Sequence, residues 1–371
     1  MLLGVPSYYI LEGFNLALLG YRGSVFAYVY IYATYAVGLL ARAVGYLVVP
    51  ARYVPAFIRL PSLRIAGLPY LLLAVAFALY APILIAHSDL LSSPREIYEV
   101  TRIGYGIQSF LSTFIVYIGF IVLLFRRYRR LWTVLFAVPA LGLLYLHGSK
   151  GQVFGFFLIW LYFVAFVQRR RFAMGRLISL CAVSTVAILS LFYVTEPASF
   201  REDLLESVVS YAAEYTRNAV LVIEDDTLEP QYGRLTLEGS YYGLIPRQFF
   251  PDKRKDFGPL WLASRYYPGR FQHEHGAPAF GLGLLYADFG VFAIFYYAVS
   301  ELLSGMMLKM LAVRLEMRPD AGTFLLFLAF MDVALIPTGS GTSLVVYYLL
   351  AHITKWLAGT VSGSAPQAVR S

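Results

Sequence analysis

Residues 107–125 read IQSFLSTFIVYIGFIVLLF and are followed directly by Arg126-Arg127-Tyr128-Arg129-Arg130. The apolar stretch contains no charged residue, and a helix needs roughly 20 such residues to cross the hydrocarbon core of a bilayer. A cluster of arginines resists translocation and stays on the cytoplasmic side of a membrane. This stretch therefore predicts a transmembrane helix that ends at the cytoplasmic face.

The composition extends this prediction to the whole chain. Of its 371 residues, 59% are hydrophobic and 14% are charged, and the mean hydropathy is +0.65. Soluble domains carry roughly 25% charged residues. Apolar runs of about the required length occupy 25–49, 68–86, 107–125, 131–146, 153–167, 177–194, 280–303, 323–336 and 344–357. We predict an all-α polytopic membrane protein with roughly nine to ten transmembrane helices.

The first apolar segment, 2–19, is a poorer candidate for a transmembrane helix. It contains Glu12 and Asn15, and no basic segment precedes it. A cleaved signal peptide has a positively charged segment before its apolar core, so we do not expect one here.

Basic residues collect in every second connector between these runs. They are Arg52, Arg59 and Arg64; Arg126, Arg127, Arg129 and Arg130; Arg169, Arg170, Arg171 and Arg176; and Lys309, Arg314 and Arg318. These connectors are predicted to be cytoplasmic, which places the long segment 195–277 outside the cell membrane. The net charge of +8 is then explained by cytoplasmic anchoring, and no nucleic-acid partner is expected.

The same patterns predict four parts along the chain. They are 1–194, N-terminal transmembrane helices; 195–277, a large loop on the exterior side; 278–358, C-terminal transmembrane helices; and 359–371, a disordered tail rich in Gly, Ser, Ala and Pro. The one cysteine, Cys181, lies in an apolar run, so no disulfide framework is expected.

Two kinds of local structure are predicted within the large loop. Ser199 and Glu202 have the spacing of a capping box ahead of a helical apolar pattern. After Gln231 the chain contains Pro246, Pro251, Pro259 and Pro268, which predict loops and short turns rather than regular structure.

The second half of this loop is basic. Arg234, Arg247, Lys253, Arg254, Lys255, Arg265 and Arg270 stand against Glu238, Asp252, Asp256 and Glu274. Guanidinium groups bind phosphate bidentately and keep their charge, so the cluster favours an anionic ligand carried by a lipid. The alternative is that these arginines balance the acidic first half of the loop and the lipid headgroups.

The turn His147-Gly-Ser-Lys-Gly151 is a second candidate anion site. Lys150 sits where the next helix begins, and a helix N-terminus offers free N–H donors and a partial positive charge. The alternative is a compact hairpin turn with a snorkelling lysine. The glycine spacing is not that of a nucleotide-binding P-loop.

The stretch Gly269-Arg-Phe-Gln-His-Glu-His-Gly276 gathers two histidines, a glutamate and an arginine. His273 and His275 share one face only in an extended strand, and the loop contains no further histidine, so no metal is expected. The composition favours acid–base chemistry, in which Glu274, His273 or His275 accepts a proton beside arginines that hold a phosphate. The alternative is a polar loop that rests at the headgroups.

Four short motifs resemble those of a known family. They are Gly148-Ser-Lys-Gly151, Arg217-Asn218, Ile245-Pro-Arg-Gln-Phe-Phe-Pro251 and Tyr286-Ala-Asp-Phe-Gly290. In these features, which cover most of the region after Ile107, the chain resembles the Wzy-type oligosaccharide repeat-unit polymerases, or O-antigen polymerases. It is more distantly similar to the O-antigen ligases.

The resemblance implies a metal-independent, inverting glycosyl transfer of the GT-C type, with no cofactor, in a bacterial inner membrane and facing the periplasm. The donor would be a glycan on undecaprenyl pyrophosphate, and the acceptor a sugar hydroxyl on a second lipid-linked repeat unit. Membrane lipids and a chain-length regulator would be further partners.

Site residues are predicted on this basis. The proton acceptor is His275, Glu274 or His273, with no spacing argument that decides among them. Pyrophosphate would be bound by Lys150, Arg217, Arg247, Arg265 and Arg270. Sugar faces would stack on Tyr241, Tyr242, Trp261, Tyr266 and Tyr267, residues that are equally common as interfacial anchors.

Two other functions are alternatives. An O-antigen ligase would transfer the finished glycan to lipid A core and would share these features. A polysaccharide transporter or lipid flippase would predict internal repeats and broken helices with polar groups near the bilayer midplane, and the sequence contains neither.

Overall fold

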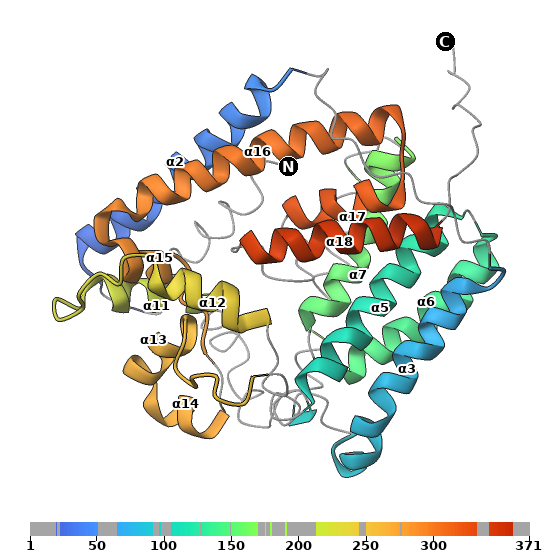
Figure 1. The fold of residues 1–371 in the computed structure, drawn as a ribbon, viewed down its shortest axis with the longest axis horizontal. Coiled ribbons are helices and arrows are strands. Elements are labelled where there is room, and N and C mark those ends of the chain that lie inside the picture. Colours follow the sequence, from blue (N-terminus) through green and yellow to red (C-terminus); the bar gives the residue numbers. More distant parts are fainter. Residues whose placement is uncertain are drawn as a thin grey trace. The chain divides into compact units, whose positions relative to one another are not determined.

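The computed structural model describes residues 20, 23–50, 65–91, 96–97, 105–126, 128–148, 150–169, 213–244, 250–274, 277–331 and 341–358, with single helical positions at 175, 179 and 190. All regular structure in these ranges is helical, as the sequence predicts (Figure 1). The chain forms two compact units. Unit 1 comprises Met1–Tyr53, Glu196–Lys309 and Pro337–Ser343, and unit 2 comprises Val54–Thr195, Met310–Ile336 and Leu344–Ser371. The predicted division into four sequential parts stays a prediction.

Four helices in the described ranges are long and apolar enough to cross a membrane. They are α2 (Val25–Val48), α3 (Leu68–Ala86), α5 (Gly106–Phe125) and the continuous stretch Leu282–Met317, which joins α15 (Leu282–Phe289), the 3-10 turn η3 (Gly290–Phe292) and α16 (Ala293–Met317). The limits of α2, α3 and α5 lie close to the predicted ones, whereas the fourth helix continues beyond its predicted end at 303 to Met317. The multi-pass architecture is thereby confirmed.

Shorter apolar helices fill most of the other predicted spans. They are α6 (Arg130–Leu146), α7 (Lys150–Tyr162) with the π-helical turn η2 (Phe163–Val167), α17 (Ala321–Phe330) and α18 (Gly341–Ala358). A short 3-10 turn, η1 (Ser88–Leu90), follows α3. The predicted span 177–194 and the segment 2–19 lie outside the described residues, so the total number of spans stays a prediction.

Unit 1 is built on a close crossing of α2 and α16. A Cβ atom on Gly45 would lie 2.1 Å from the carbonyl oxygen of Leu302, and one on Gly305 would lie 2.0 Å from that of Arg42. Arg42 also forms an ion pair with Glu301 across the two helices. Only glycine permits this backbone approach, and each charge has a partner within the helix pair.

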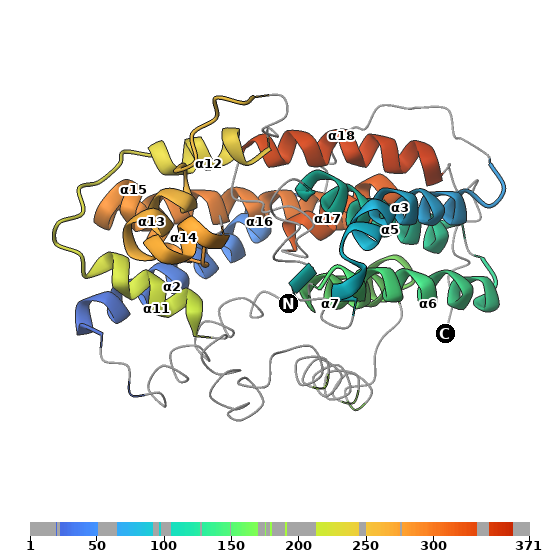
Figure 2. The same cartoon turned by 90° about the horizontal axis from the view of Figure 1, so that it is seen from below.

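Four helices lie within the predicted loop 195–277, which we call the insert; α11 and α12 pack on α15, α13 packs on α12, and α14 packs on α13 in unit 1 (Figures 1 and 2). They are α11 (Glu214–Ile223), α12 (Arg234–Leu244), α13 (Pro259–Tyr266) and α14 (Pro268–Glu274). Leu282 of α15 packs with α11 and α2, whereas Ala287 and Phe280 pack with α11, α12 and α13. The insert therefore shares its core with the membrane helices and is fixed to them.

The prediction of loops and turns after Gln231 is wrong for this region. Pro259 and Pro268 are the first residues of α13 and α14. Proline is favoured at the first helical position, where its missing N–H group has no intrahelical acceptor to lose. Two of the four prolines therefore start helices instead of preventing them. The predicted helix after Ser199 lies outside the described residues.

Unit 2 is organised around α5, which packs against α3, α6, α7 and α17. Arg126, the C-cap of α5, donates hydrogen bonds to the carbonyl oxygens of Ile65 (2.6 Å) and Leu357 (2.7 Å). A guanidinium group at the end of α18 satisfies carbonyls that the helix leaves without N–H donors. Arg126 thus joins the start of α3 to the ends of α5 and α18.

Candidate functional site

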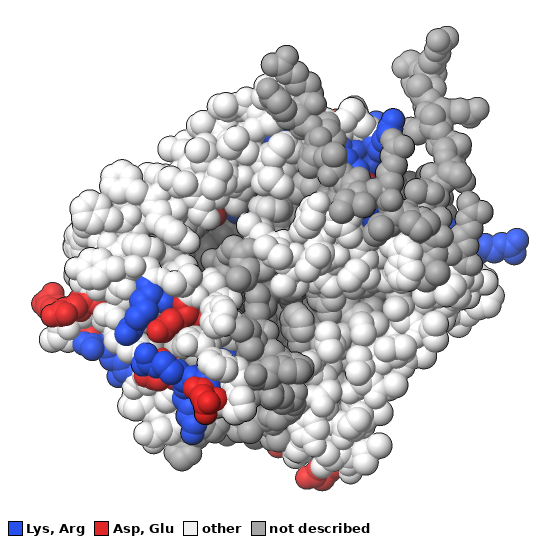
Figure 3. All heavy atoms as spheres, in the orientation of Figure 1, with Lys and Arg blue, Asp and Glu red and all other residues white. Residues whose placement is uncertain are grey.

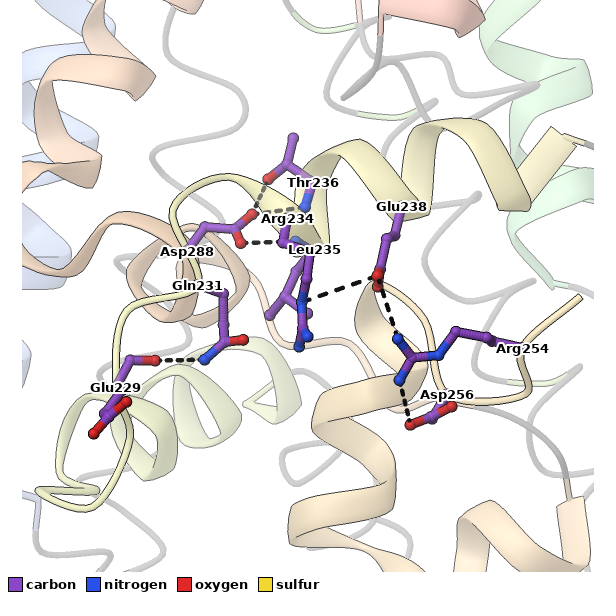
Figure 4. Close-up of polar contacts among 9 residues, drawn as sticks. All are labelled: Glu229, Gln231, Arg234, Leu235, Thr236, Glu238, Arg254, Asp256 and Asp288. Atoms are coloured by element: carbon purple, nitrogen blue, oxygen red, sulfur yellow. Dashed lines mark hydrogen bonds and ion pairs between the residues drawn. The ribbon is translucent and has the colours of Figure 1, made fainter.

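The insert is held to α15 by the buried carboxylate of Asp288, a residue of the motif Tyr286-Ala-Asp-Phe-Gly290 for which the sequence predicts no role. Asp288 accepts hydrogen bonds from the backbone N–H groups of Leu235 (2.8 Å) and Thr236 (2.6 Å) and from the Thr236 hydroxyl (Figure 4). These N–H groups belong to the first turn of α12, which has no intrahelical acceptors for them. Asp288 therefore caps α12 from a distant part of the chain.

Acids and bases of the basic half-loop alternate along α12 and in the connector that leads from α12 to α13. Glu238 lies 3.9 Å from the Nε of Arg234 and 3.8 Å from the Nη1 of Arg254, which also pairs with Asp256 (Figure 4). On the face drawn in Figure 3, charged side chains of both signs gather over the insert helices. These two arginines are thus partly neutralised by acids of the same half-loop.

Arg265 is also paired. Its guanidinium group, on the last turn of α13, donates to Asp225 Oδ2 (Nε 2.9 Å) and to the Thr227 hydroxyl (2.6 Å). Burial by itself raises the pKa of Asp225, but hydrogen bonds from Thr227, Tyr266 and Arg265 outweigh it and lower the pKa to about 2. Pyrophosphate binding by Arg265 would therefore involve a guanidinium group that the protein already holds in place.

The other predicted pyrophosphate ligands are described to different extents. Arg217 is half-buried on α11. Lys150 begins α7, as predicted, and Arg270 lies within α14, but nothing is described of their side chains. Arg247 lies outside the described residues. The structure therefore places Arg217, Arg265 and Arg270 on three helices of one unit.

The predicted sugar-binding aromatics fall into two groups. Tyr241 is 53% exposed and meets Tyr242 edge to face, and Tyr242 stacks on Phe250. These rings form an aromatic surface at the end of α12. Exposed aromatic faces of this kind suit the apolar faces of sugars.

The second group comprises Trp261, Tyr266 and Tyr267. Each of these side chains already contacts another residue of the insert, through its ring or its hydroxyl group. The Arg234 guanidinium lies 5.4 Å from the centroid of the Trp261 ring. The Tyr266 hydroxyl donates to Asp225 (2.7 Å), and the Tyr267 hydroxyl donates to Asn218 (2.6 Å). These three residues make contacts that hold the insert helices together.

The stretch Gly269–Gly276 is only partly described. Its first part forms α14, whereas the side chains of His273 and Glu274 and all of His275 lie outside the description. Among the residues that are described, no group of three or more His, Cys, Asp and Glu side chains could hold a metal ion. The roles predicted for the two histidines and Glu274 stay predictions.

The turn that carries Lys150 is fixed at both flanks in unit 2. Tyr80 donates to the carbonyl oxygen of Leu146 (2.9 Å), and Tyr117 donates to that of Gln152. His147 is buried, its ring is tilted against that of Tyr80 with centroids 3.9 Å apart, and its Nε2 lies 3.2 Å from the Ser112 hydroxyl. This cluster is not predicted from the sequence, where its signal is the presence of polar residues within apolar runs.

The fold and the site together define a multi-pass helical membrane protein with a charged, aromatic-rich helical insert packed onto its membrane helices. The chain is 30% identical, over 345 residues, to the O-antigen polymerases of Salmonella typhimurium and Salmonella typhi. The matched region covers 92% of this chain and 83% of each relative. The chain therefore belongs to the O-antigen polymerase family of polymerising enzymes. No family model and no solved structure matches it.

Proposed function

We propose that this enzyme joins oligosaccharide repeat units, each carried on undecaprenyl pyrophosphate, into O-antigen or a related surface polysaccharide on the periplasmic side of the bacterial inner membrane. The observation that carries the proposal is the match to two O-antigen polymerases over 92% of the chain. The charged insert packed onto membrane helices supports it, because a lipid-linked anionic substrate needs both surfaces.

The proposed reaction is an inverting displacement at the anomeric carbon of the donor glycan. A sugar hydroxyl of the acceptor repeat unit attacks this carbon while its proton passes to a base of the enzyme. The bond between the anomeric carbon and the phosphate oxygen breaks, and undecaprenyl pyrophosphate leaves with the bonding electrons. The enzyme must therefore supply a proton acceptor and positive charge for the departing pyrophosphate.

The residues proposed for these tasks are those of the sequence analysis. His275, or Glu274 with a histidine partner, accepts the proton, with His273 as the third candidate. Lys150, Arg217, Arg247, Arg265 and Arg270 contribute charge for the pyrophosphate. Tyr241 and Tyr242 are the stronger candidates for stacking on sugar, since Trp261, Tyr266 and Tyr267 make contacts within the insert.

The proposal is tested with purified enzyme and a synthetic repeat unit on undecaprenyl pyrophosphate. A ladder of products spaced by one repeat unit is the expected result, and it should persist in the presence of a chelator. A single transfer to a lipid A–core acceptor without a ladder would indicate a ligase. Loss of the ladder on addition of a chelator would show that the reaction requires a metal ion.

The proton acceptor is tested by single substitutions of His273, Glu274 and His275 with glutamine or alanine. At least one variant should lose polymer formation by about 100-fold or more while remaining folded in the membrane. Full activity in all three variants would show that the stretch takes no part in the reaction.

A further inference from the structure

A single buried side chain joins the two ends of the candidate catalytic stretch. Asn218, on α11, is fully buried. Its Nδ2 donates to the carbonyl oxygen of Ala279 (2.8 Å), and its Oδ1 accepts from the Tyr267 hydroxyl (2.6 Å). Tyr267 directly precedes α14, and Ala279 follows Gly276 by three residues. Both ends of the segment 268–278 are therefore bound to one amide group.

The chemistry of this contact requires an asparagine. An amide offers a donor and an acceptor in one plane, and here each has a partner of the opposite kind. In a buried position, a polar group that loses its partner bears the full cost of desolvation. Asn218 therefore resists replacement by an apolar residue or by the isosteric aspartate, which has no N–H group for Ala279.

Asn218 lies on a part of α11 that packs closely against α15. Its neighbour Ala219 lies so close to α15 that a Cβ atom on Gly283 would be 2.9 Å from the Ala219 Cα atom. Val222, one turn after Asn218, and Val220, on another face of α11, are both completely buried. Asn218 is thus attached to the part of the insert that is packed most tightly onto the long helix Leu282–Met317.

A second contact brings the same two ends together. The centroid of the Tyr267 ring lies 6.3 Å from that of Phe280, the residue after Ala279. Phe271 and Ala277 pack on the same buried cluster as Tyr267 and Phe280. The described residues at the two ends of the segment 268–278 therefore lie on one buried cluster, and Asn218 of α11 makes a polar contact to each end.

We infer that Asn218 is a positioning residue for the polymerisation reaction. It fixes both ends of the segment that carries Arg270, His273, Glu274 and His275 relative to α11, where Arg217 is its neighbour. The inference rests on the proposed function, and it adds a residue that contacts no substrate. Displacing a catalytic group by about 1 Å costs on the order of 100-fold in rate.

The experiment compares Asn218→Ala, Asn218→Asp and Tyr267→Phe with the wild-type enzyme. We call the two hydrogen bonds of Asn218, to Tyr267 and to Ala279, the clamp. Tyr267→Phe keeps the ring contact to Phe280 but removes one of these two hydrogen bonds. Ser264→Ala is the matched control, because it removes one insert hydrogen bond, to the Trp261 carbonyl oxygen, away from the segment. The measurements are kcat and KM for the repeat unit, and amide hydrogen exchange resolved by peptide.

The expected result has three parts. Asn218→Ala lowers kcat about 10- to 100-fold with a change in KM of less than about threefold, since the segment is displaced while most binding surfaces remain. Hydrogen exchange rises in peptides covering 268–278 and is unchanged in α12. The double variant Asn218→Ala/Tyr267→Phe is no worse than Asn218→Ala, because both changes break one clamp.

Three results would overturn the inference. They are wild-type kcat in a folded Asn218→Ala protein, additive losses in the double variant, and raised exchange throughout the insert, which would assign Asn218 to general stability. A wild-type enzyme that makes no ladder refutes the proposed function. A wild-type ladder together with a fully active Asn218→Ala refutes only the positioning role.

Discussion

Arg265, in the last turn of α13, pairs with Asp225, two residues beyond the end of α11, at 2.9 Å between Nη2 and Oδ2. The Tyr266 hydroxyl donates to the same oxygen. This contact closes the end of α11 onto α13, so a residue proposed to bind pyrophosphate also joins two helices of the insert.

Substituting Arg265 or Asp225 separately distinguishes the proposed role of Arg265 in pyrophosphate binding from its structural role in the ion pair. Arg265→Lys replaces a planar fork with a point charge, and we expect polymer formation to fall by about tenfold or more. Asp225→Asn removes the ion pair but leaves the fork, so it should lower thermal stability by roughly 1 kcal/mol and largely preserve activity. Arg127→Lys, in a predicted cytoplasmic connector, is the control. Equal loss of activity in Asp225→Asn and Arg265→Lys would make Arg265 a structural residue alone.

The contribution of Asp225 to stability should depend on acid pH. Its pKa is about 2 in the folded protein and roughly 3.9 in an unfolded chain. The contribution is therefore complete above about pH 5 and is lost as the pH falls towards 2. Melting temperatures of wild-type and Asp225→Asn protein in detergent should differ at neutral pH and converge in acid. A constant difference from about pH 6 to pH 2 would contradict the prediction.

Asp288→Ala should destabilise α12. The change leaves the N–H groups of Leu235 and Thr236 without their acceptor, at a cost of about 2 kcal/mol. Thermal unfolding and hydrogen exchange of α12 amides measure the effect. Asp256→Ala is the control, because the Asp256 side chain is 40% exposed and its loss should change stability by less than about 0.5 kcal/mol. Equal stability of the two variants would refute the capping role.

The glycine contact between α2 and α16 predicts an unusual cost for a very small change. Gly305→Ala should destabilise the protein strongly, since the added methyl group would meet the backbone of Arg42. Gly142→Ala, on α6, should be neutral or slightly stabilising, because its Cβ meets no atom within 4 Å and alanine favours a helix. Folded yield and melting temperature in detergent compare the two. A normal melt for Gly305→Ala would contradict the close crossing.

The side of the membrane that holds the insert is predicted from the arginine pattern. Reporter fusions at Gly239 should report a periplasmic position, and fusions in the connector after Arg169 a cytoplasmic one. A cytoplasmic Gly239 would remove the proposed access of the insert to periplasmic repeat units.

The sequence predicts the membrane helices well because their formation depends on local composition. A run of about 20 apolar residues bounded by arginines determines its own structure in a bilayer, so α3 begins and ends at the predicted residues 68 and 86. The insert helices were harder to predict. Proline is common both at the first position of a helix and in turns. Only the segment that follows Pro259 shows that this proline starts a helix.

The connections within the candidate site could not be predicted from single residues. Asp288 caps a helix more than 50 residues earlier in the chain, and Asn218 meets Ala279 61 residues later. Neither pairing leaves a local pattern, because each is created when separate helices pack on α15. Composition alone predicted that the insert is charged and aromatic, but the partners of Arg265 and Tyr267 depend on the folded structure.

The contact between α2 and α16 also constrains how the protein is made. Arg42 and Glu301 are 259 residues apart in the chain. At roughly 5–20 residues per second, ribosomal synthesis of that interval takes on the order of tens of seconds. Throughout this time α2 has been made and its partner helix has not, so its arginine has no counter-charge from Glu301. During this time the charge of Arg42 needs another environment that solvates it, such as water or lipid headgroups. The contact between α2 and α16 in unit 1 forms only after α16 has been synthesised.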